Sequence, residues 1–257
     1  MASKQPPGID TGDLARKISK QAIYERQLPR KFYESVEVSV DGDLFAISLD
    51  DKPVRTPMKN TLALPNERLA RAIAQEWSDQ KEFIDPDTMP FTRFANTALD
   101  RVAPRREDII SEIVEYAGSD LLCYRANEPR ELISRHVEHW DPLLDWAKEA
   151  LGAQFETIQG VVHKEQQAET MSAIRKSAEA HGAFALTGLH NIMTMTGSAI
   201  MALAVVRHAI SGMVAWQAAH VDEDWQIEQW GEDAEAAARR ALRHDEFMAT
   251  VKFLELV

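Results

Sequence analysis

The chain has 257 residues, of which 45% are apolar, enough to bury a core in one large domain or two ordinary ones. Its 41 acidic and 29 basic residues give a net charge of −12, which argues against binding a nucleic-acid backbone as the main task. The single cysteine, Cys123, excludes an internal disulfide and a cluster of thiolate metal ligands, and it fits a reducing compartment.

Residues 1–29 are polar and are expected to form a flexible segment with a short helix around Leu14 to Glu25. Lysines and aspartates are mixed in this segment without an apolar run, so it resembles neither a secretory signal nor an Arg-rich transit peptide. Because Met1 is present, we expect a bacterial cytoplasmic protein, with the mitochondrial matrix as the alternative.

A small antiparallel sheet is predicted in the segment that follows, because apolar residues alternate there between turn-forming pairs. Its parts are a strand from Phe32 to Val40, a turn at Asp41-Gly42, a returning strand from Leu44 to Leu49, a turn at Asp50-Asp51, and two shorter extended pieces at 53–56 and 61–64. Three helices are expected next: one capped by Asn66 and ending near Phe83, one over 90–102, and one that starts at Pro104 and stops at Gly118.

The rest of the chain has almost entirely helical periodicity. A long helix is predicted over 130–151, closed by Gly152, then an extended crossing over 153–162, and from Lys164 onward only helices, broken at Gly182, Gly188, Gly197, Gly212 and Gly231. The predicted fold class is therefore α+β, with a small N-terminal antiparallel sheet packed with helices, followed by an all-helical C-terminal domain. We place the flexible segment at 1–29, the α/β domain at 30–120 and the helical domain at 121–257.

The stretch from Ala183 to Val206 contains no charged residue and must be buried. Its threonines, His190 and Asn191 would be costly in hydrocarbon, so a helix or helix pair in the protein core is the better interpretation than a membrane span.

An acidic, tryptophan-rich stretch follows, and on one continuous helix it would carry an apolar stripe on each side. Trp216, His220, Glu223, Ile227 and Trp230 share one face of that helix. A carboxylate within such a stripe must be paired, protonated or at an interface. His220 or a distant arginine could satisfy Glu223 internally, so a structural role and a partner contact are both open. Asp222, Asp224 and Glu228 point elsewhere and are expected to be solvated.

The other groups of residues that could form a catalytic or ligand-binding site give only weak evidence for one. The chain has no glycine-rich phosphate loop, and Gly197-Ser198 lacks the sequence context of a nucleophile elbow. His136 and His139 lie three apart and could ligate zinc, but a solvated helix surface with His139 against Trp140 is the simpler interpretation, so no metal and no cofactor are predicted. Cys123 is expected to be a buried, unreactive thiol.

The pair Glu76-Trp77, with Gln80, lies on the helix that covers the sheet. Trp77 continues an apolar stripe, so core packing is favoured over a direct contact with a partner, although the contact stays open.

An ordered series of short motifs resembles a known family. The series is Arg30-Lys31-Phe32-Tyr33, Leu49-Asp50, Thr56-Pro57, Glu76-Trp77-Ser78-Asp79-Gln80, Met89-Pro90, Asp120-Leu121-Leu122-Cys123-Tyr124-Arg125, Trp140-Asp141-Pro142 and the stretch from Asp222 to Gly231. From Arg30 to the C-terminus the chain resembles the bacterial form of the assembly chaperones for the alpha subunit of the F-type ATP synthase.

The resemblance implies a non-catalytic protein that binds the unassembled alpha subunit and shields the apolar surface destined for the beta subunit. A monomer is expected, although no sequence feature determines the oligomeric state. It implies an N-terminal α/β domain and a C-terminal helical domain. The charge and the polar residues of 183–206, as argued above, predict no nucleic-acid partner and no stable membrane insertion. The partner-binding candidates are Trp77 in the first domain and Glu223, Asp224, Gln226 and Trp230 in the second. The chain departs from the family pattern at Gly197-Ser198, where members often carry Lys-Ser.

Two other classes of function are compatible with the sequence. One is a small-molecule enzyme in which His220 and Glu223 form an acid–base pair, which requires a pocket that contains both groups. The other is a helical adaptor for a different partner.

Overall fold

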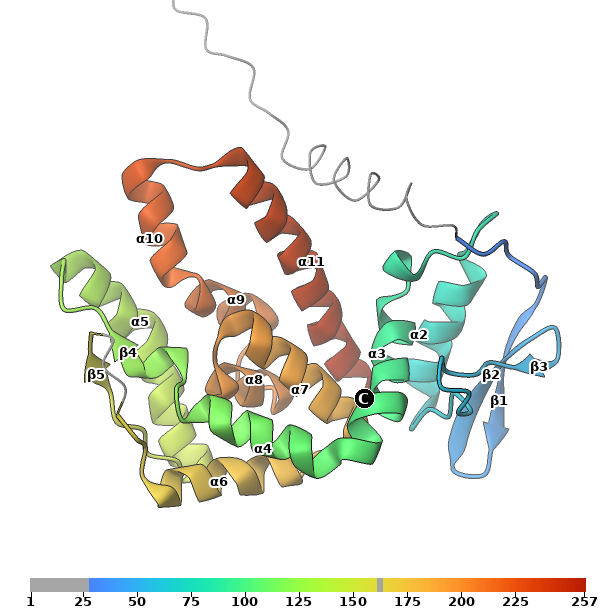
Figure 1. Ribbon diagram of the computed structural model, residues 1–257, viewed down its shortest axis with the longest axis horizontal. Coiled ribbons are helices and arrows are strands. Elements are labelled where there is room, and N and C mark those ends of the chain that lie inside the picture. The colour runs from blue at the N-terminus through green and yellow to red at the C-terminus, as the bar shows by residue number, and fades with distance from the viewer. Residues whose placement is uncertain (1–27, 161–163) are drawn as a thin grey trace, which may run out of the picture.

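The computed structural model describes residues 28–160 and 164–257, and the helix expected around Leu14 to Glu25 lies outside these ranges. In Figure 1 a sheet with its covering helices lies at one end of the molecule, and a larger group of helices makes up the rest. The predicted α+β class, with the sheet first and helices after it, is confirmed.

The N-terminal sheet has three antiparallel strands in the order β1-β2-β3, formed by Val36–Asp41, Leu44–Leu49 and Lys52–Pro53. The predicted turns lie within one residue of their expected places: β1 and β2 are joined by Gly42 and Asp43, and β2 and β3 by Asp50 and Asp51. Gly42 has φ of +62°, whereas Asp50 and Asp51 have φ of +46° and +65°, which short polar residues tolerate. The first strand starts later than predicted, at Val36, and Phe32 lies outside it with a side chain that is 70% exposed.

Helices cover one face of the sheet. Asn66 caps α2 (Glu67–Ser78), as predicted, by accepting a hydrogen bond from the Leu69 N–H. The helix ends at Ser78 and not near Phe83, because Gln80 uses its side chain to bind the following loop. That loop holds a short 3-10 turn, Pro86–Thr88, before α3 (Pro90–Thr97) and a π-helical turn, Ala98–Val102. The sheet, α2 and α3 enclose one hydrophobic cluster, which also contains Phe253 from the C-terminal helix.

The connection to the helical part contains most of the remaining irregular structure. A 3-10 turn, Ala103–Arg105, leads into α4 (Arg106–Ala117), and a second, Leu121–Cys123, leads into β4 (Tyr124–Arg125). Then α5 (Arg130–Trp146) continues as a π-helical turn, Ala147–Leu151, and β5 (Ile158–Gln159) pairs with β4 in parallel. The helices expected over 104–118 and 130–151 are thus confirmed.

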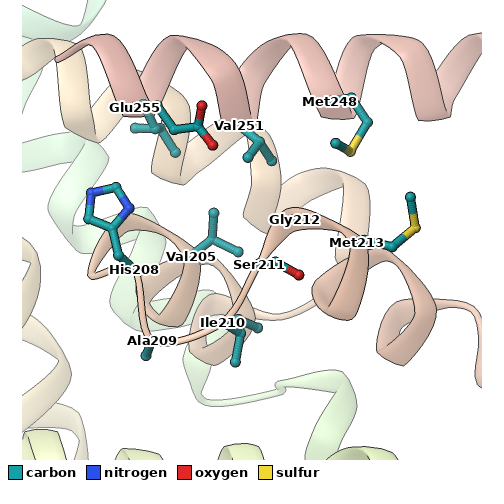
Figure 2. A pocket seen from close by; sticks show the side chains of 11 residues that line it. Val205, His208, Ala209, Ile210, Ser211, Gly212, Met213, Met248, Val251 and Glu255 are labelled. Atoms are coloured by element: carbon teal, nitrogen blue, oxygen red, sulfur yellow. The ribbon is translucent and has the colours of Figure 1, made fainter.

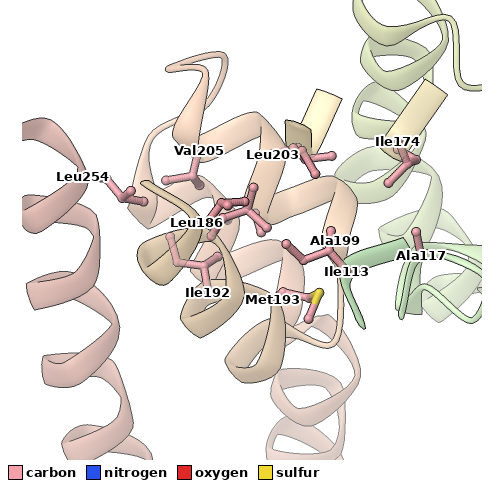
Figure 3. Close-up of a cluster of buried hydrophobic side chains, with 14 of the residues drawn as sticks. Ile113, Ala117, Ile174, Leu186, Ile192, Met193, Ala199, Leu203, Val205 and Leu254 are labelled. Atoms are coloured by element: carbon pink, nitrogen blue, oxygen red, sulfur yellow. The ribbon is translucent and has the colours of Figure 1, made fainter. Parts of the chain in front are cut away.

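The remaining helices are α6 (Ala168–Glu179), α7 (Ala183–Thr196), α8 (Ala199–Val206), α9 (Gly212–Ala219), α10 (Val221–Trp230) and α11 (Ala234–Leu256). The uncharged stretch forms the pair α7 and α8, whose side chains fill the centre of the helical cluster in Figure 3. Gly197, with φ of +72°, separates the two helices, as predicted. Gly188 was expected to break the stretch but lies inside α7, because its missing side chain leaves room for Leu254 of α11.

Two of the hydrophobic clusters meet along α11, where Phe253 belongs to the sheet cluster and Leu254 to the helical cluster. A further cluster, around Trp140 of α5, includes Ile200 of α8 and Val221 of α10. Side chains of α4, including Ile110 and Ile113, pack in the helical cluster. The division of the chain at residue 120 stays a prediction. Within the described residues, no helix combines the length and the hydropathy that crossing a bilayer requires.

Candidate functional site

The acidic stretch is divided into two helices at His220, so the expectation of one continuous helical face was wrong. The backbone of His220 has φ of −113° and ψ of 15°, and its N–H bonds to the Gln217 carbonyl at 3.2 Å. The carbonyl of Trp216 instead accepts a hydrogen bond from Nδ1 of the His220 ring at 2.7 Å. The ring lies on Trp216, with 3.8 Å between centroids. Consequently Trp216 is buried in the core, whereas Trp230 is 79% exposed.

The orientation of His220 does not suit an acid–base pair with Glu223. Because Nδ1 donates to the Trp216 carbonyl, the neutral ring presents Nε2 as an acceptor, and Nε2 lies 3.8 Å from the Glu223 carboxylate. Burial lowers the pKa of His220, with the Arg240 guanidinium adding to the shift, which favours that neutral form. The distance is too long for a hydrogen bond.

Helix α10 is held mainly by its acidic side chains, since Val221 is its one buried residue. Asp222 accepts a hydrogen bond from His136 Nε2 at 2.7 Å, and the Ala126 N–H donates to the other nitrogen of that ring at 3.3 Å. Asp224 forms an ion pair with Arg240 of α11 at 2.6 Å. Asp222, Asp224 and Glu228 are 41–52% exposed, so water reaches them as expected, but each also has a close basic partner that the sequence did not indicate.

The far end of α10 is bound to α5 through Arg135. Its guanidinium makes two hydrogen bonds to Glu228, at 2.9 and 2.5 Å, and lies 4.9 Å from the ring centroid of Trp225. These hydrogen bonds lower the pKa of the Glu228 carboxyl. Sequence reasoning missed Arg135, His136 and Arg240 as the residues that position α10. His136 and Asp222 are 86 positions apart, and Arg135 and Glu228 are 93 apart.

Glu223 has only long contacts within the described chain. Its carboxylate lies 3.8 Å from His220 and 4.0 Å from Arg240, and the side chain is 42% exposed. Both internal partners that the sequence suggested are therefore near, but neither is at hydrogen-bonding distance.

A hollow of about 250 Å³ lies between α10 and the start of α11. Its lining includes Glu223, Gln226, Ile227, Trp230 and Arg240, and His220 is not part of it. We call the exposed surface formed by Glu223, Gln226, Ile227 and Trp230 the α10 surface. The α10 surface contains three of the predicted partner-binding residues, Glu223, Gln226 and Trp230. The fourth residue predicted on this helix, Asp224, forms its ion pair with Arg240 instead.

Trp77 belongs to α2, which lies with the sheet on one side of α11 in Figure 1, whereas α10 lies on the other side. Its ring is partly buried and makes an edge-to-face contact with Tyr33, whose hydroxyl donates to the Trp77 carbonyl at 2.7 Å. The neighbouring Glu76 is buried and accepts hydrogen bonds from the Phe91 and Thr92 N–H groups at 2.7 and 2.8 Å. Burial raises the pKa of the Glu76 carboxyl.

Gln80 completes this structural motif by donating to the Glu76 carbonyl and accepting from the Asp85 N–H at 2.7 Å. Through these contacts Glu76 joins α2 to the first turn of α3, and Gln80 joins α2 to the loop before α3.

His136 and His139, which the sequence spacing would allow to share a zinc ion, have different surroundings. His136 is 3% exposed and stacks on Trp140 at 3.7 Å, so the residue against Trp140 is His136 and not His139. Residues 28–160 and 164–257 contain no group of three His, Cys, Asp or Glu side chains that could hold a metal ion. Cys123 is buried, as predicted, and burial together with the Asp120 carboxylate raises the pKa of its thiol to about 12, so the thiolate is scarce at neutral pH.

A larger cavity, about 420 Å³, lies between the α8–α9 connection and α11, and none of the candidate residues lines it. Figure 2 shows apolar side chains such as Val205, Ile210 and Val251 in its wall, with His208 and Glu255 at one side.

Comparisons with known proteins give consistent results. Residues 30–148 match the family model described as ATP12 chaperone protein. The crystal structure of Atp12 from Paracoccus denitrificans is 40% identical, matches 89% of this chain and 98% of that chain, and has a TM-score of 0.85. A structure from Agrobacterium tumefaciens is 42% identical, matches 93% of this chain and 90% of that chain, and has the same TM-score of 0.85.

Proposed function

The chain belongs to the ATP12 chaperone family, a family of non-enzymatic assembly factors for the alpha subunit of ATP synthase, and we propose that it binds the unassembled alpha subunit through the α10 surface. On this proposal it covers the apolar surface of the alpha subunit that later contacts the beta subunit, acts as a monomer, and works in the bacterial cytoplasm. Covering that surface would prevent the aggregation to which unassembled subunits are prone.

The observation that carries the proposal is the exposure of Trp230 beside a hollow. A tryptophan that is 79% exposed is costly to leave in water and is the residue type that most often anchors a protein interface. The adjoining hollow of about 250 Å³ could accept an apolar side chain of the client, while Gln226 supplies hydrogen bonds at its edge.

Glu223 is the acidic residue of α10 best suited to a charged contact with the client. Asp222, Asp224 and Glu228 already have close basic partners, at 2.7, 2.6 and 2.5 Å, whereas the contacts of Glu223 are 3.8 and 4.0 Å long. An arginine or backbone N–H of the client could therefore form a charge-assisted hydrogen bond with Glu223. The beta subunit would replace that contact during assembly.

The test is co-expression with the alpha subunit from the same organism, followed by size-exclusion chromatography, with the beta subunit as the specificity control. We expect a soluble complex with alpha and none with beta. Trp230→Ala should weaken the complex by roughly 30-fold or more, the effect of losing an interface hot spot of about 2 kcal/mol. Glu223→Gln should weaken it as well, because the charge is lost while the shape is kept.

Two glutamines provide a matched comparison. Gln226 lines the hollow and Gln229 does not, although both are exposed on the same helix. Gln226→Ala should weaken the complex, and Gln229→Ala should leave it unchanged. If Gln226→Ala and Gln229→Ala change the affinity for alpha equally, or if Glu223→Gln binds alpha like the parent chain, the α10 surface is not the binding site.

The Trp77→Ala variant belongs in the same experiment, since Trp77 remains a proposed contact. Because its ring packs against Tyr33, binding by this variant has to be compared at equal folded fraction. If alpha aggregates and elutes apart from the parent chain, the proposed function fails, and a helical adaptor for another partner becomes the better proposal.

A further inference from the structure

One edge of the N-terminal sheet is open. Strand β1 pairs with β2, and in residues 28–160 and 164–257 no strand pairs with the other side of β1. An open edge presents unpaired N–H and C=O groups, which can pair with an extended segment of another chain.

The hairpin geometry determines which residues present those groups. The turn between β1 and β2 has two residues, so its flanking pair, Asp41 and Leu44, is hydrogen-bonded, and hydrogen-bonded pairs alternate along the strands. At the end of the hairpin away from the turn, the Ser35 carbonyl accepts a hydrogen bond from the Asp50 N–H at 3.2 Å. This pair agrees with the alternation, since Ser35 is also an odd-numbered residue. Odd-numbered residues of β1 therefore bind β2, and Val36, Val38 and Val40 direct their backbone groups to the open edge.

The side chains of the same three valines face a groove next to the open edge. They line a space of about 390 Å³ between β1 and α2, together with Phe45, Ala74 and the polar side chains of Glu67, Arg71, Gln75 and Ser78. Val40 is 71% exposed. A strand added at this edge would form backbone hydrogen bonds and place every second side chain over the groove.

The charges of β1 indicate the chemistry of its partner. Glu37 and Asp41 are exposed on the opposite face of the strand, and no ion pair within the described residues uses either one. A second copy of β1 in antiparallel register about Ser39 would place Glu37 opposite Asp41, and like charges in such pairs are destabilising. A partner strand with basic residues at these positions would be stabilised instead.

We propose that the open edge of β1 binds an extended segment of the client, in which apolar side chains alternate with basic ones. This inference rests on the proposed function, since the client is the unassembled alpha subunit. Figure 1 places β1 and α10 at opposite ends of the molecule, so the β1 edge would be a second contact, independent of the α10 surface.

The first test is amide hydrogen exchange, measured by NMR on the full chain alone and in complex with the alpha subunit. In the free chain the amides of Val36, Val38 and Val40 should exchange quickly, and those of Glu37 and Ser39 slowly. Binding should slow exchange at the three valines by about tenfold or more, as expected for amides that gain a hydrogen bond. Unchanged valine amides in the complex would overturn the inference.

The second test uses proline at a position whose N–H faces outward. Val38→Pro removes that N–H without removing a hydrogen bond to β2, and Val38→Ala controls for the lost side-chain packing. We expect Val38→Pro to bind alpha about tenfold more weakly than Val38→Ala, the upper range for one lost hydrogen bond. If Val38→Pro does not fold, Val40→Pro against Val40→Ala replaces it, because Val40 is 71% exposed.

The outcomes separate this inference from the proposed function. If alpha binds and both proline variants bind like their alanine controls, the β1 edge is not a contact, whereas the α10 surface stands. If alpha does not bind the parent chain, both proposals fall. If the free chain dimerises and the valine amides are protected in the dimer, the occupant is a second copy and the inference is wrong.

Discussion

The contact between α7 and α11 gives a sharp stability prediction for Gly188→Ala. A Cβ atom at Gly188 would lie 2.5 Å from Cδ2 and 2.6 Å from Cγ of Leu254, about 1 Å closer than carbon atoms pack. Leu254 is 7% exposed and has little room to move. Overpacking of this kind costs about 1–3 kcal/mol, and the better helix propensity of alanine returns up to about 1 kcal/mol.

We therefore expect Gly188→Ala to lower the free energy of unfolding by about 1–2 kcal/mol, which corresponds to a fall in Tm of about 2–8 °C. Urea denaturation followed by tryptophan fluorescence would measure it. Gly182→Ala is the control, because a Cβ there would meet nothing within 4 Å. Gly182 is the N-cap of α7 with φ of −75°, where alanine caps less well than glycine but restricts the unfolded chain, so that variant should stay within about 1 kcal/mol of the parent chain.

A double-mutant cycle tests the physical reason. In a Leu254→Ala background the obstructing atoms are absent, so adding Gly188→Ala should cost almost nothing or should stabilise the helix. If Gly188→Ala costs the same in both backgrounds, the close approach to Leu254 is not the cause and the reasoning is refuted. Because Leu254 is next to Phe253, a displaced α11 would disturb both hydrophobic clusters.

Three further predictions concern single residues. Trp230→Ala should leave the free energy of unfolding within about 0.5 kcal/mol of the parent, since the side chain is 79% exposed, and a larger loss in urea denaturation would show that Trp230 is structural. Glu76→Ala should destabilise by about 2–4 kcal/mol, because the Phe91 and Thr92 N–H groups lose their acceptor; an unchanged urea midpoint would contradict this. Burial raises the pKa of Asp120 from 3.8 to about 6. The protonated Asp120 carboxyl therefore makes its full contribution to the free energy of unfolding below pH 4, and this contribution is lost as the pH rises through 6. Asp120→Asn should lack this fall, which amounts to about 3 kcal/mol between pH 4 and 7 in parallel unfolding titrations, and equal profiles would refute the assignment.

The elements that could be predicted from the sequence are those whose causes are local. Asn66 and the turn at Asp50-Asp51 act within a few residues of their own position, so the cap of α2 and the β2–β3 hairpin could be predicted. The uncharged stretch was also recognisable as buried, because burial follows from composition alone.

The elements that could not be predicted depend on contacts between distant segments. Gly188 has the same local appearance as a helix-breaking glycine, and only the approach of Leu254 explains why it lies inside a helix. His220 leaves the helical conformation because its ring, lying on Trp216, takes over the carbonyl that a helical N–H would use. The ion pairs of α10 join residues far apart in the sequence, and no periodicity predicts which arginine meets which carboxylate.

The same ion pairs bear on how a chaperone could both hold and release a client at α10. The carboxylates of these pairs are 41–52% exposed, and pairs that water reaches contribute about 0–1 kcal/mol each. With Val221 as its one buried residue, α10 is positioned by charge and geometry more than by apolar burial. A client arginine that approaches Glu223 would compete with Arg240, whose closer contact is the 2.6 Å pair with Asp224. Binding and release would then exchange one partner of Glu223 for another and would leave no buried charge unpaired. On the proposed function, the energetic difference at Glu223 between the free and bound states would therefore be small, as expected for a contact that is displaced during assembly.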